Sequence, residues 1–505
     1  MSSGGDGGTG ASGCTVRRRA AVVVVANSPG EISGWARPVV ERLRALETRV
    51  APAFGGLGVV VVVPPCPFAS GREAEVAAGI AGVDAVVAPS EYLRYALFGV
   101  VPKGLRPLSG SPGVVVHLGG DPMHSALLSR RLGYPAVLYT DRTAGFVGSF
   151  ARFMVEDARV EAKLRKKGVP AEKIAIVGNL MIDGVEVGVR RDAARAALGV
   201  ETDAPLVCLM PGSRKQQIFY AMPFFLRVAE IVKRFRGDAE FVAVLSPYVG
   251  PSMVSAALSA AAAGPPAGTA GAMTAAEDAA TSSRAGSRRA GVGKWDRAET
   301  QRGARRSEQA RRRLEGARGR LVPLADTREA SAANALGPEY LIETDEGASV
   351  KLVAGCRYGA MAASDVAVAM PGTVTAELAF LGVPTVVAVP MNVPEEVPLP
   401  GLPGLLGGIP IAGRYLKRIS VQKALERIEF TAIPNKRQRR MITPEVRGII
   451  GAHDVAIKVL ELLQDAKARG RIALELRQAM GQPGASVRVA SVILETLMST
   501  GGRRG

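Results

Sequence analysis

Short, continuous apolar runs alternate with helix-patterned stretches along the first part of the chain. Each run is too short for a helix and is followed by Gly, Pro or small polar residues, so we predict a strand for each. The predicted strands are 21–26, 59–63, 85–88, 114–117, 136–139 and 174–177. Strands that are apolar throughout are typical of parallel sheets covered by helices on both faces. The pattern therefore predicts an α/β fold with an open, mostly parallel sheet.

A second series of the same kind begins near Ala204, with predicted strands at 206–210, 241–245, 321–323, 340–344, 366–369 and 384–389. A chain of 505 residues is too long for one ordinary core. We therefore predict two Rossmann-like domains facing a cleft, where ligands commonly bind. The expected order is a disordered tail at 1–16, an N-terminal domain at 17–200, a C-terminal domain at 201–440 and amphipathic helices at 441–500.

The segment from about 251 to 320 is rich in Ala, Gly and Arg and has hardly any large apolar residues, so we predict a disordered insertion. Residues 281–320 carry 13 Arg or Lys against 4 Asp or Glu, which is 9 of the net +18 charges. The rest of the chain is mildly basic. This balance favours an anionic substrate or an anionic membrane surface, and we expect no nucleic-acid partner.

Targeting and metal signals are weak. No run of about 18 apolar residues is present, so no membrane span is expected. Arg17, Arg18 and Arg19 before the run 20–26 resemble an export signal, but the run is short and continues into a loop, so we interpret it as the first strand. The four cysteines are far apart, and the three histidines form no ligand pattern. We expect a cytoplasmic protein with no metal and no cofactor.

A strand, a Gly turn and a helix start follow one another at Val366–Glu377. Gly372, Thr373 and Thr375 lie where backbone N–H groups and the positive end of the helix dipole face a ligand, and a diphosphate suits that place. Glu377, one turn later, is placed to accept two hydroxyls of a ribose. The alternative is an ordinary helix start with a solvated Glu, and the stretch alone leaves both open.

A second phosphate-binding loop is predicted where strand 206–210 ends. Gly212, Ser213 and Arg214 offer backbone N–H groups, a hydroxyl and a guanidinium. Two such loops and one diol acceptor in the same domain indicate a nucleoside diphosphate. The chain has no GxxxxGK[ST] motif, which disfavours phosphoryl transfer by a P-loop.

The first domain offers two candidate general bases. Asp121 follows strand 114–117 and precedes Pro122, so it suits either a helix N-cap or a base that takes a proton from an attacking hydroxyl. His124, one turn later, could orient it. Glu31, in the Gly-flanked loop after the first strand, is the rival base.

These motifs resemble those of the lipid-A-disaccharide synthase family, glycosyltransferases of the GT-B type. Glu31-Ile32-Ser33-Gly34 resembles the family's GEASG, and residues 211–218 resemble PGSR…EI. Residues 372–377 resemble SGTxTLE, and 433–436 followed by 442–445 resemble LPN…VPE. The resemblance marks further candidate substrate-binding residues, namely Ser33, Gly34, Asn179 and Asn435.

The resemblance implies a metal-independent, inverting transfer of a sugar from a UDP-2,3-diacylglucosamine type donor to a lipid-linked sugar acceptor. It places the enzyme at the inner face of the membrane. It also implies C-terminal helices that cross back over the first domain and allow a homodimer. Trp35, Gln217 and Pro371 stand where the family has Asp, Glu and Ser. A nonhydrolysing UDP-sugar epimerase and a non-catalytic UDP-sugar-binding homologue therefore remain alternatives.

Two apolar stretches with neighbouring cationic residues are candidates for contact with a membrane. Residues 92–101 combine Tyr, Leu, Phe and Val with Arg94, Lys103 and Arg106 nearby, and residues 399–411 are followed by Arg414, Lys417 and Arg418. Such stretches are either membrane-docking surfaces or parts of the core. The spacing alone leaves both open.

Overall fold

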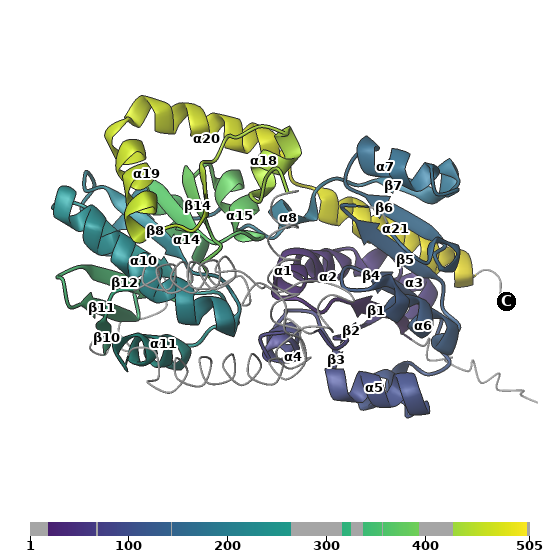
Figure 1. The fold of residues 1–505 in the computed structure, drawn as a ribbon. Helices are drawn as coiled ribbons and strands as arrows, with labels where there is room; N and C mark the ends of the chain where they lie inside the picture. The colour runs from purple at the N-terminus through teal and green to yellow at the C-terminus, as the bar shows by residue number, and fades with distance from the viewer. Residues whose placement is uncertain are drawn as a thin grey trace, which may run out of the picture. The chain divides into compact units, whose positions relative to one another are not determined.

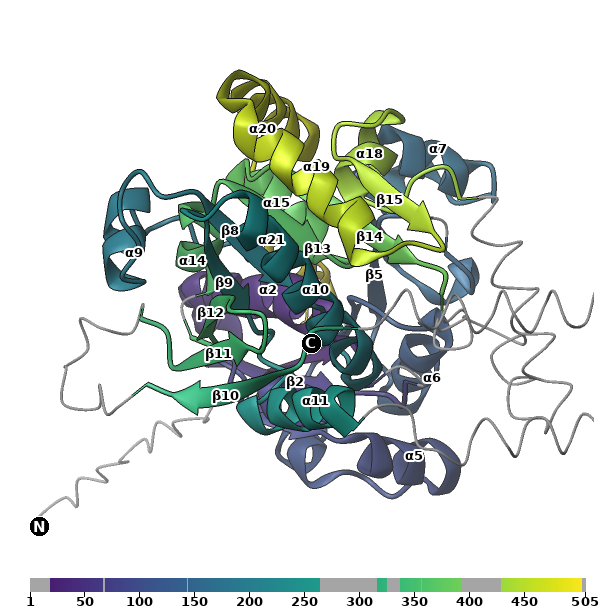
Figure 2. The same cartoon turned by 60° about the vertical axis from the view of Figure 1, so that its left-hand side comes forward.

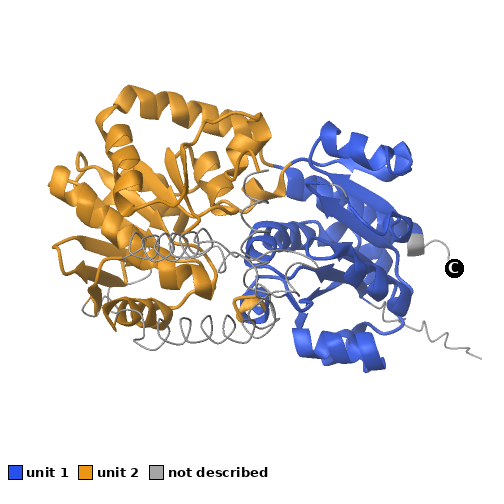
Figure 3. Ribbon diagram, viewed as in Figure 1, with its two compact units in different colours: residues 1–66, 74–178, 484–505 blue, residues 67–73, 179–483 orange. Residues whose placement is uncertain are grey.

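In this computed structural model, the described residues are 19–66, 69–142, 144–263, 316–324, 337–355, 357–392 and 428–501. They form two compact units (Figure 3). Unit 1 comprises Met1–Cys66, Ala74–Gly178 and Gly484–Gly505, and unit 2 comprises Pro67–Glu73 and Asn179–Pro483. Residues 179–200, which the sequence analysis placed in the N-terminal domain, thus belong to unit 2, whereas the last helix belongs to unit 1.

Unit 1 contains a seven-stranded sheet in the order β3-β2-β1-β4-β5-β6-β7, with every pair parallel. The strands are β1 (Ala20–Val25), β2 (Leu57–Val62), β3 (Ala85–Val87), β4 (Gly113–His117), β5 (Ala136–Thr140), β6 (Arg152–Val155) and β7 (Ile174–Ile176). Only β6 was not predicted. The order 3-2-1-4-5-6 is that of Rossmann sheets, which bind ligands where the strand order reverses, here between β1 and β4.

The helices of unit 1 lie between its strands, except for α21, which comes from the C-terminal end of the chain (Figure 1). They are α1 (Pro29–Glu31), the π-helix η1 (Ile32–Ala36), α2 (Arg37–Ala45), η2 (Glu47–Arg49), α3 (Ala51–Phe54), α4 (Glu73–Ala78), α5 (Pro89–Phe98), η3 (Lys103–Leu108), α6 (Pro122–Leu132), η4 (Val147–Ser149), α7 (Ala158–Arg165), η5 (Ala171–Lys173) and α21 (Ala485–Gly501). Helix α21 contacts α2, β4 and β6, and Arg488 Nε donates to the Val177 carbonyl at 2.7 Å. The predicted return of the C-terminal helices is therefore confirmed for α21.

Unit 2 contains an eight-stranded sheet in the order β10-β11-β12-β9-β8-β13-β14-β15. Its strands are β8 (Leu206–Met210), β9 (Glu240–Val244), β10 (Gly319–Pro323), β11 (Tyr340–Thr344), β12 (Ser349–Val353), β13 (Val366–Ala369), β14 (Thr385–Pro390) and β15 (Glu445–Gly448). Strand β11 pairs antiparallel with β10 and with β12, and all other neighbouring strands, including β12 and β9, pair parallel. The order reverses between β8 and β13, and the predicted α/β class with two Rossmann-like sheets is confirmed.

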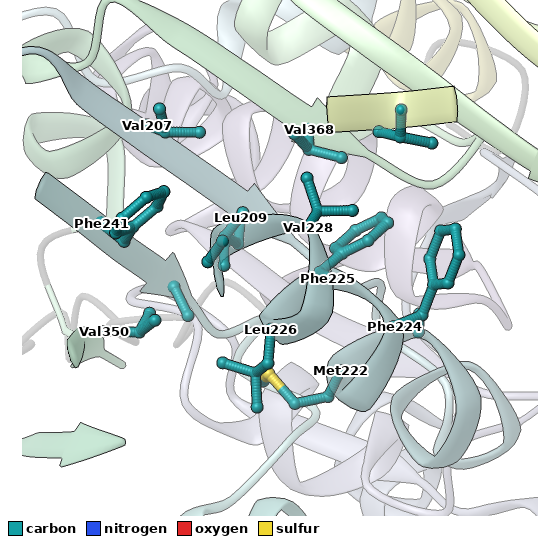
Figure 4. Packing of buried hydrophobic residues seen from close by; sticks show 14 of the residues in the cluster. Val207, Leu209, Met222, Phe224, Phe225, Leu226, Val228, Phe241, Val350 and Val368 are labelled. Carbon is teal, nitrogen blue, oxygen red and sulfur yellow. The ribbon is translucent and has the colours of Figure 1, made fainter. Parts of the chain in front are cut away.

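Both faces of the unit 2 sheet are covered, as continuous apolar strands predict. Val207 and Leu209 face a cluster with α10, α11 and α19, whereas Cys208 and Met210 face one with α9, α14 and α15. Figure 4 shows Phe225 of α10 in the first cluster. Burial raises the pKa of the Cys208 thiol to about 12, so this cysteine is a core residue.

The helices of unit 2 are visible from two sides in Figures 1 and 2. They are α8 (Leu180–Asp183), α9 (Arg191–Ala197), α10 (Lys215–Phe235), α11 (Pro251–Ala263), α14 (Arg357–Ala363), α15 (Val374–Leu381), α18 (Ile433–Gln438), α19 (Ala452–Gln464) and α20 (Ala466–Met480). Helices α19 and α20 pack against α10 and α15, so these two C-terminal helices stay in unit 2. A homodimer through the C-terminal helices remains a prediction.

The prediction of a disordered insertion from about 251 was wrong at its start. Residues 251–263 form α11, whose Val254, Ala257 and Leu258 are buried against α10. At the other end, the Ala317 N–H donates to the Pro223 carbonyl of α10 at 2.9 Å. Because Ala and Val at helical spacing bury enough area against a long helix, low complexity did not prevent packing. Residues 264–315 lie outside the described residues.

Among the helices of the described segments, none is both long and apolar enough to cross a bilayer.

Candidate functional site

The strand reversal of unit 2 brings two predicted ligand loops to one edge of the sheet. Strands β8 and β13 are paired, with Met210 opposite Ala369, and the Met370 N–H donates to the Met210 carbonyl at 3.2 Å. Because the strands are parallel, residues 211–214 and 370–373 leave the sheet beside each other. The proximity of the two loops is therefore a direct result of strand order.

The loop after β8 leads into the N-terminus of α10. Arg214 is the N-cap residue and makes no side-chain cap hydrogen bond. Gly212 has a φ of 110°, and a Cβ there would lie 2.6 Å from Gln217 Oε1, so the turn requires glycine. The same Gln217 oxygen accepts from the Ser213 N–H at 3.3 Å. A neutral amide thus holds the loop and leaves the positive end of the helix dipole uncompensated by a carboxylate.

The loop after β13 leads into α15 in a similar way. Thr373 is the N-cap residue and also makes no side-chain cap hydrogen bond. Thr375 is buried, and its Oγ1 donates to the Gly372 carbonyl at 2.8 Å and accepts from the Ile433 N–H at 3.1 Å. The Thr375 hydroxyl therefore joins the turn to α18, and its proposed contact with substrate finds no support in these bonds.

Glu377 lies in the first turn of α15 and is almost completely buried. Its Oε1 forms an ion pair with Arg357 Nη2 at 3.0 Å and accepts a hydrogen bond from Tyr358 OH at 3.2 Å. Within the described residues, Oε2 has no hydrogen-bond partner. Of the two interpretations that the sequence left open, the solvated Glu does not hold, and one carboxylate oxygen remains to accept from a ligand.

Asn435 was predicted to bind substrate, but its side chain is used inside the protein. Its Nδ2 donates to the Thr443 carbonyl at 2.8 Å and to Glu445 Oε1 at 2.9 Å. Its Oδ1 accepts from the N–H groups of Ile442 and Thr443 at 2.8 and 2.9 Å. An amide has two donors and two acceptor positions, and all four are occupied. In this conformation Asn435 has a structural role.

Glu445 holds the same region together. It accepts from Thr431 Oγ1 at 2.6 Å and from the Ala432 N–H at 2.9 Å, and it pairs with Arg447. Burial raises the pKa of this carboxyl, but the hydrogen bonds from Thr431, Ala432 and Arg447 outweigh burial and lower it below the ordinary value. The motif at 433–445 therefore stabilises the loops of unit 2.

In unit 1, Glu31 connects the two loops at the strand reversal. Its Oε2 accepts from the N–H groups of Asn27 and Ser28 at 3.2 and 3.1 Å, and its Oε1 accepts from the Gly120 N–H at 3.1 Å. A Cβ on Gly119 would lie 2.1 Å from Glu31 Cδ, so glycine permits this approach. Both carboxylate oxygens are engaged, which weakens the case for Glu31 as a base.

Asp121 has the N-cap role that the sequence left open. Its Oδ1 accepts from the Met123 N–H at 2.8 Å at the start of α6, and the residue is exposed. Its Oδ2 has no hydrogen-bond partner in the part of the chain that the structure describes. Capping and proton abstraction are therefore compatible, because each uses a different oxygen.

Two histidines lie near Asp121 but are held by other groups. His124 Nδ1 is 2.7 Å from Tyr92 OH, and His117 Nδ1 is 2.8 Å from Ser125 Oγ. Burial lowers the pKa of His117 to about 4 and also lowers that of His124, although the charge of Asp121 opposes both shifts. Burial raises the pKa of Tyr92 to about 12. At neutral pH all three groups are uncharged.

The remaining candidates lie in or beside helix starts. Ser33 and Gly34 belong to the π-helix η1, a feature often found at functional sites, and a Cβ on Gly34 would meet nothing within 4 Å. Trp35, in the place of the family's Asp, is buried and packs edge-on against Tyr139 with ring centroids 5.2 Å apart. Asn179 caps α8 by accepting from the Met181 N–H at 3.0 Å.

Two residues that were not predicted, Arg357 and Tyr358, shape the site in unit 2, and so does Gln217, for which no role was predicted. The motif at 211–218 includes Gln217 and was noted only for its difference from Glu. Arg357 and Tyr358 precede Glu377 by about twenty residues and form no motif with it, so only the packing of α14 beside α15 reveals them.

Over the described segments, no group of three or more His, Cys, Asp or Glu is placed to hold a metal ion.

Part of the chain is similar in sequence to one known family. The family model described as lipid-A-disaccharide synthetase matches residues 162–254, which include Asn179 and the loop 211–214. The lipid-A-disaccharide synthase of Bordetella petrii is 31% identical over 106 residues, or 18% of this chain and 26% of the relative. That of Bordetella pertussis is 39% identical over 75 residues, or 15% and 18%. The chain thus spans about a quarter or less of the length of these curated relatives.

Solved structures also resemble the chain, at low similarity. A putative UDP-N-acetylglucosamine 2-epimerase from Listeria monocytogenes has a TM-score of 0.45 at 12% identity and covers 96% of this chain and 97% of its own. MurG from Acinetobacter baumannii has a TM-score of 0.43 at 13% identity, with 94% and 99% covered. These values are too low to support a function. The predicted resemblance to the lipid-A-disaccharide synthase family is confirmed over residues 162–254.

Proposed function

We propose that this protein is a glycosyltransferase that moves a sugar from a UDP-sugar to a lipid-linked acceptor. The observation that carries the proposal is the pair of uncapped helix N-termini, of α10 and α15, at the strand reversal of unit 2. A diphosphate needs donors and positive potential at one place, and two adjacent helix starts provide both. Glu377, one turn into α15, supplies an acceptor for a ribose hydroxyl.

The proposed transfer is a single displacement with inversion. The acceptor oxygen attacks the anomeric carbon from the side opposite the diphosphate, the bond from that carbon to the diphosphate oxygen breaks, and UDP leaves with the electron pair. The helix starts of α10 and α15, with Ser213 and Arg214, stabilise the departing charge without requiring a metal. The acceptor hydroxyl gives its proton to a carboxylate.

Asp121 is the better candidate for that carboxylate. Its Oδ2 has no partner among the described residues, whereas Glu31 accepts from three backbone N–H groups through both oxygens. A base needs a lone pair within reach of the proton it removes. The proposal requires Asp121 to reach the acceptor hydroxyl when both substrates are bound.

The substrates follow from the family resemblance. Lipid-A-disaccharide synthases match this chain within 162–254 and over short segments, so a donor of the UDP-2,3-diacylglucosamine type and a lipid-linked sugar acceptor are part of the proposal. An acylated acceptor keeps its chains out of water, so the proposed enzyme works at the inner face of a membrane.

Helix α5 supports a membrane-facing role for unit 1. Tyr92 and Tyr95 are buried in the core, so their assignment to a docking patch was wrong. The opposite side of α5 and the residues after it form the α5 face, which consists of the exposed Leu93, Leu97, Phe98, Val100 and Val101. The second predicted patch, at 399–411, lies outside the described residues.

Cations accompany the α5 face. Arg94, Lys103 and Arg106 are exposed, and the one acidic residue of α5, Glu91, lies in its first turn at the opposite end from Phe98. An apolar surface with a cationic border complements an anionic lipid bilayer. Each cation near such a surface contributes about 1 kcal/mol, and salt screens this contribution.

Vesicle sedimentation tests this surface. Wild-type protein should bind vesicles that contain phosphatidylglycerol, bind weakly to neutral vesicles and dissociate at high salt. The double variant Leu97→Glu, Phe98→Glu should lose binding. The matched control is Leu474→Glu, Phe235→Glu, which alters an exposed Leu and Phe of unit 2. Equal loss in both double variants, or no binding by the wild type at low salt, would refute membrane docking through α5.

The activity itself is tested by incubating the full chain with UDP-sugars and lipid-linked sugar acceptors. The proposal expects UDP release together with a new lipid-linked glycoside, detected by mass spectrometry. Conversion of the UDP-sugar to an epimer without an acceptor would replace the proposal by the epimerase alternative. Binding of UDP without any turnover would identify a non-catalytic homologue.

A further inference from the structure

Glu377 belongs to a buried group of three side chains that the sequence does not reveal. Arg357 Nη2 is 3.0 Å from Glu377 Oε1, and the two side chains are only 14% and 8% exposed. Arg357 also donates to Tyr358 OH, which in turn donates to the same Glu377 oxygen at 3.2 Å. The Arg357 guanidinium lies 4.3 Å from the centroid of the Tyr358 ring. Oε1 of Glu377 is therefore held from two directions.

Such a pair is a poor source of stability. Removing two charges from water carries a large desolvation cost, and an apolar pair of similar volume often stabilises a fold as well or better. Burial lowers the pKa of Arg357, but the charge of Glu377 and the hydrogen bond to Tyr358 outweigh burial and raise it above the ordinary value. Arg357 thus stays charged beside Glu377, which suggests a role other than stability.

The geometry suggests that role. With Oε1 held by two donors, the carboxylate plane is fixed and Oε2 is the oxygen left for a ligand. A free Glu side chain loses rotamer entropy when it is ordered by a ligand. A carboxylate that is already ordered avoids most of this loss, so it binds a hydroxyl more tightly.

We infer that Arg357, together with Tyr358, is a positioning residue that orients Glu377 so that Oε2 accepts from a ribose hydroxyl of the nucleotide. The inference rests on the proposed function, because it takes the ligand of the α15 start to be a UDP-sugar. Arg357 acts through Glu377 and touches no substrate itself. Its removal should therefore weaken recognition of the ribose hydroxyls and leave recognition of the diphosphate in place.

The test compares the affinities of UDP and 2′-deoxy-UDP for the full chain by titration calorimetry, with 3′-deoxy-UDP as a second probe. Wild-type protein should prefer UDP by about five- to tenfold over whichever probe lacks the hydroxyl bound by Oε2. Glu377→Gln and Arg357→Met should both reduce this preference toward unity. Arg357→Lys, which keeps the charge, should retain part of it, and Tyr358→Phe should reduce it less than Arg357→Met.

Controls separate positioning from general stability. Lys351→Met breaks another ion pair of unit 2, between Lys351 and Glu240 at 2.6 Å, and should keep the preference for UDP. If Arg357→Met fails to fold, Tyr358→Phe and Arg357→Lys carry the test. A folded Arg357 variant that loses UDP and both deoxy-UDPs equally would overturn the inference while the proposed function stands. Absence of UDP binding by the wild type would overturn both.

Discussion

The two sheets reverse their strand order in the same way, but the charged side chains at the helix starts beside the two reversals differ. In unit 1, carboxylates accept from backbone N–H groups at both helix starts of the reversal. Glu31 accepts from the N–H groups of Asn27 and Ser28 before α1, although the Ser28 side chain makes no cap hydrogen bond, and Asp121 caps α6. In unit 2, the N-termini of α10 and α15 have no side-chain cap hydrogen bond. The charge of Glu377 there is paired with Arg357.

This difference shows how one fold can serve two purposes. A helix start that a carboxylate already caps repels a phosphate, whereas an uncapped start attracts one. The unit 1 reversal therefore suits groups that accept protons, and the unit 2 reversal suits groups that bind anions. The proposed assignment of the base to unit 1 and of the nucleotide to unit 2 makes the comparison testable.

The largest effect is expected from Asp121→Asn. Asn keeps the N-cap oxygen but is a poor base, so turnover should fall by about 10²–10⁴-fold while the affinity for UDP stays unchanged. Asp157→Asn is the matched control, because Asp157 caps α7 in the same way. Steady-state assays of glycoside formation and calorimetry with UDP measure the two quantities. If Glu31→Gln, rather than Asp121→Asn, removes turnover without lowering the melting temperature, Glu31 is the base.

Anion binding in unit 2 is tested by Arg214→Ala. Loss of a charged hydrogen bond should weaken UDP binding by about 1–3 kcal/mol, and the loss should shrink as salt increases. Arg236→Ala removes a guanidinium that pairs with Asp238 on the surface and should leave UDP affinity unchanged. Calorimetry at low and high salt gives both values. Equal affinities of wild type and Arg214→Ala would remove Arg214 from the nucleotide site.

The two units should also differ in their response to acid, through His117. Its pKa is about 4 in the folded protein and near 6.5 when unfolded, so the unfolded state binds the proton first. The stabilisation by neutral His117 is complete above about pH 6.5 and is lost as the pH falls toward 4. Between about pH 7 and about pH 5, the free energy of unfolding should therefore fall by roughly 2 kcal/mol.

Chemical unfolding at both pH values measures this dependence. His117→Gln should make the free energy of unfolding less dependent on pH. His453→Gln, the same change in unit 2, should leave the pH dependence as it is. Hydrogen exchange should show unit 1 opening first as the pH falls. An unchanged pH dependence in His117→Gln would show that His117 does not titrate between the two states.

The smallest effect is expected from deleting residues 264–315. The composition of these residues predicts no core, and neither the proposed base nor the proposed nucleotide contacts lie among them. Stability, UDP affinity and turnover should therefore stay nearly unchanged. Extending the deletion back to 255 also removes Ala257 and Leu258 of α11. Loss of a buried Leu costs about 2–5 kcal/mol, so this longer deletion should lower the melting temperature. Equal melting temperatures of the two deletions would contradict the packing of α11.

Local sequence predicted most of the elements that carry the site. Apolar runs identified β8 and β13, and the Gly turn after β13 identified the start of α15. The loop 212–214 was predicted to bind phosphate, but the helix start at Lys215 beside it was not predicted. These signals are local, because a buried strand and a turn are specified by neighbouring residues. Strands β6, β12 and β15 were missed, since each is short and includes charged or polar residues.

Tertiary structure decided what the side chains at these elements do. Glu31 meets Gly120 across 89 residues, and Arg488 meets Val177 across 311, so neither contact can be found by spacing. Both depend on which strands and helices are neighbours. The same holds for Glu377, whose partner Arg357 comes from α14, and for Asn435, whose amide is used by residues 442–445. The sequence by itself determined where the strands β8 and β13 end and where a Gly turn follows each of them. Whether each helix start is capped, paired or open depends on contacts between distant residues, which only the packed chain brings together.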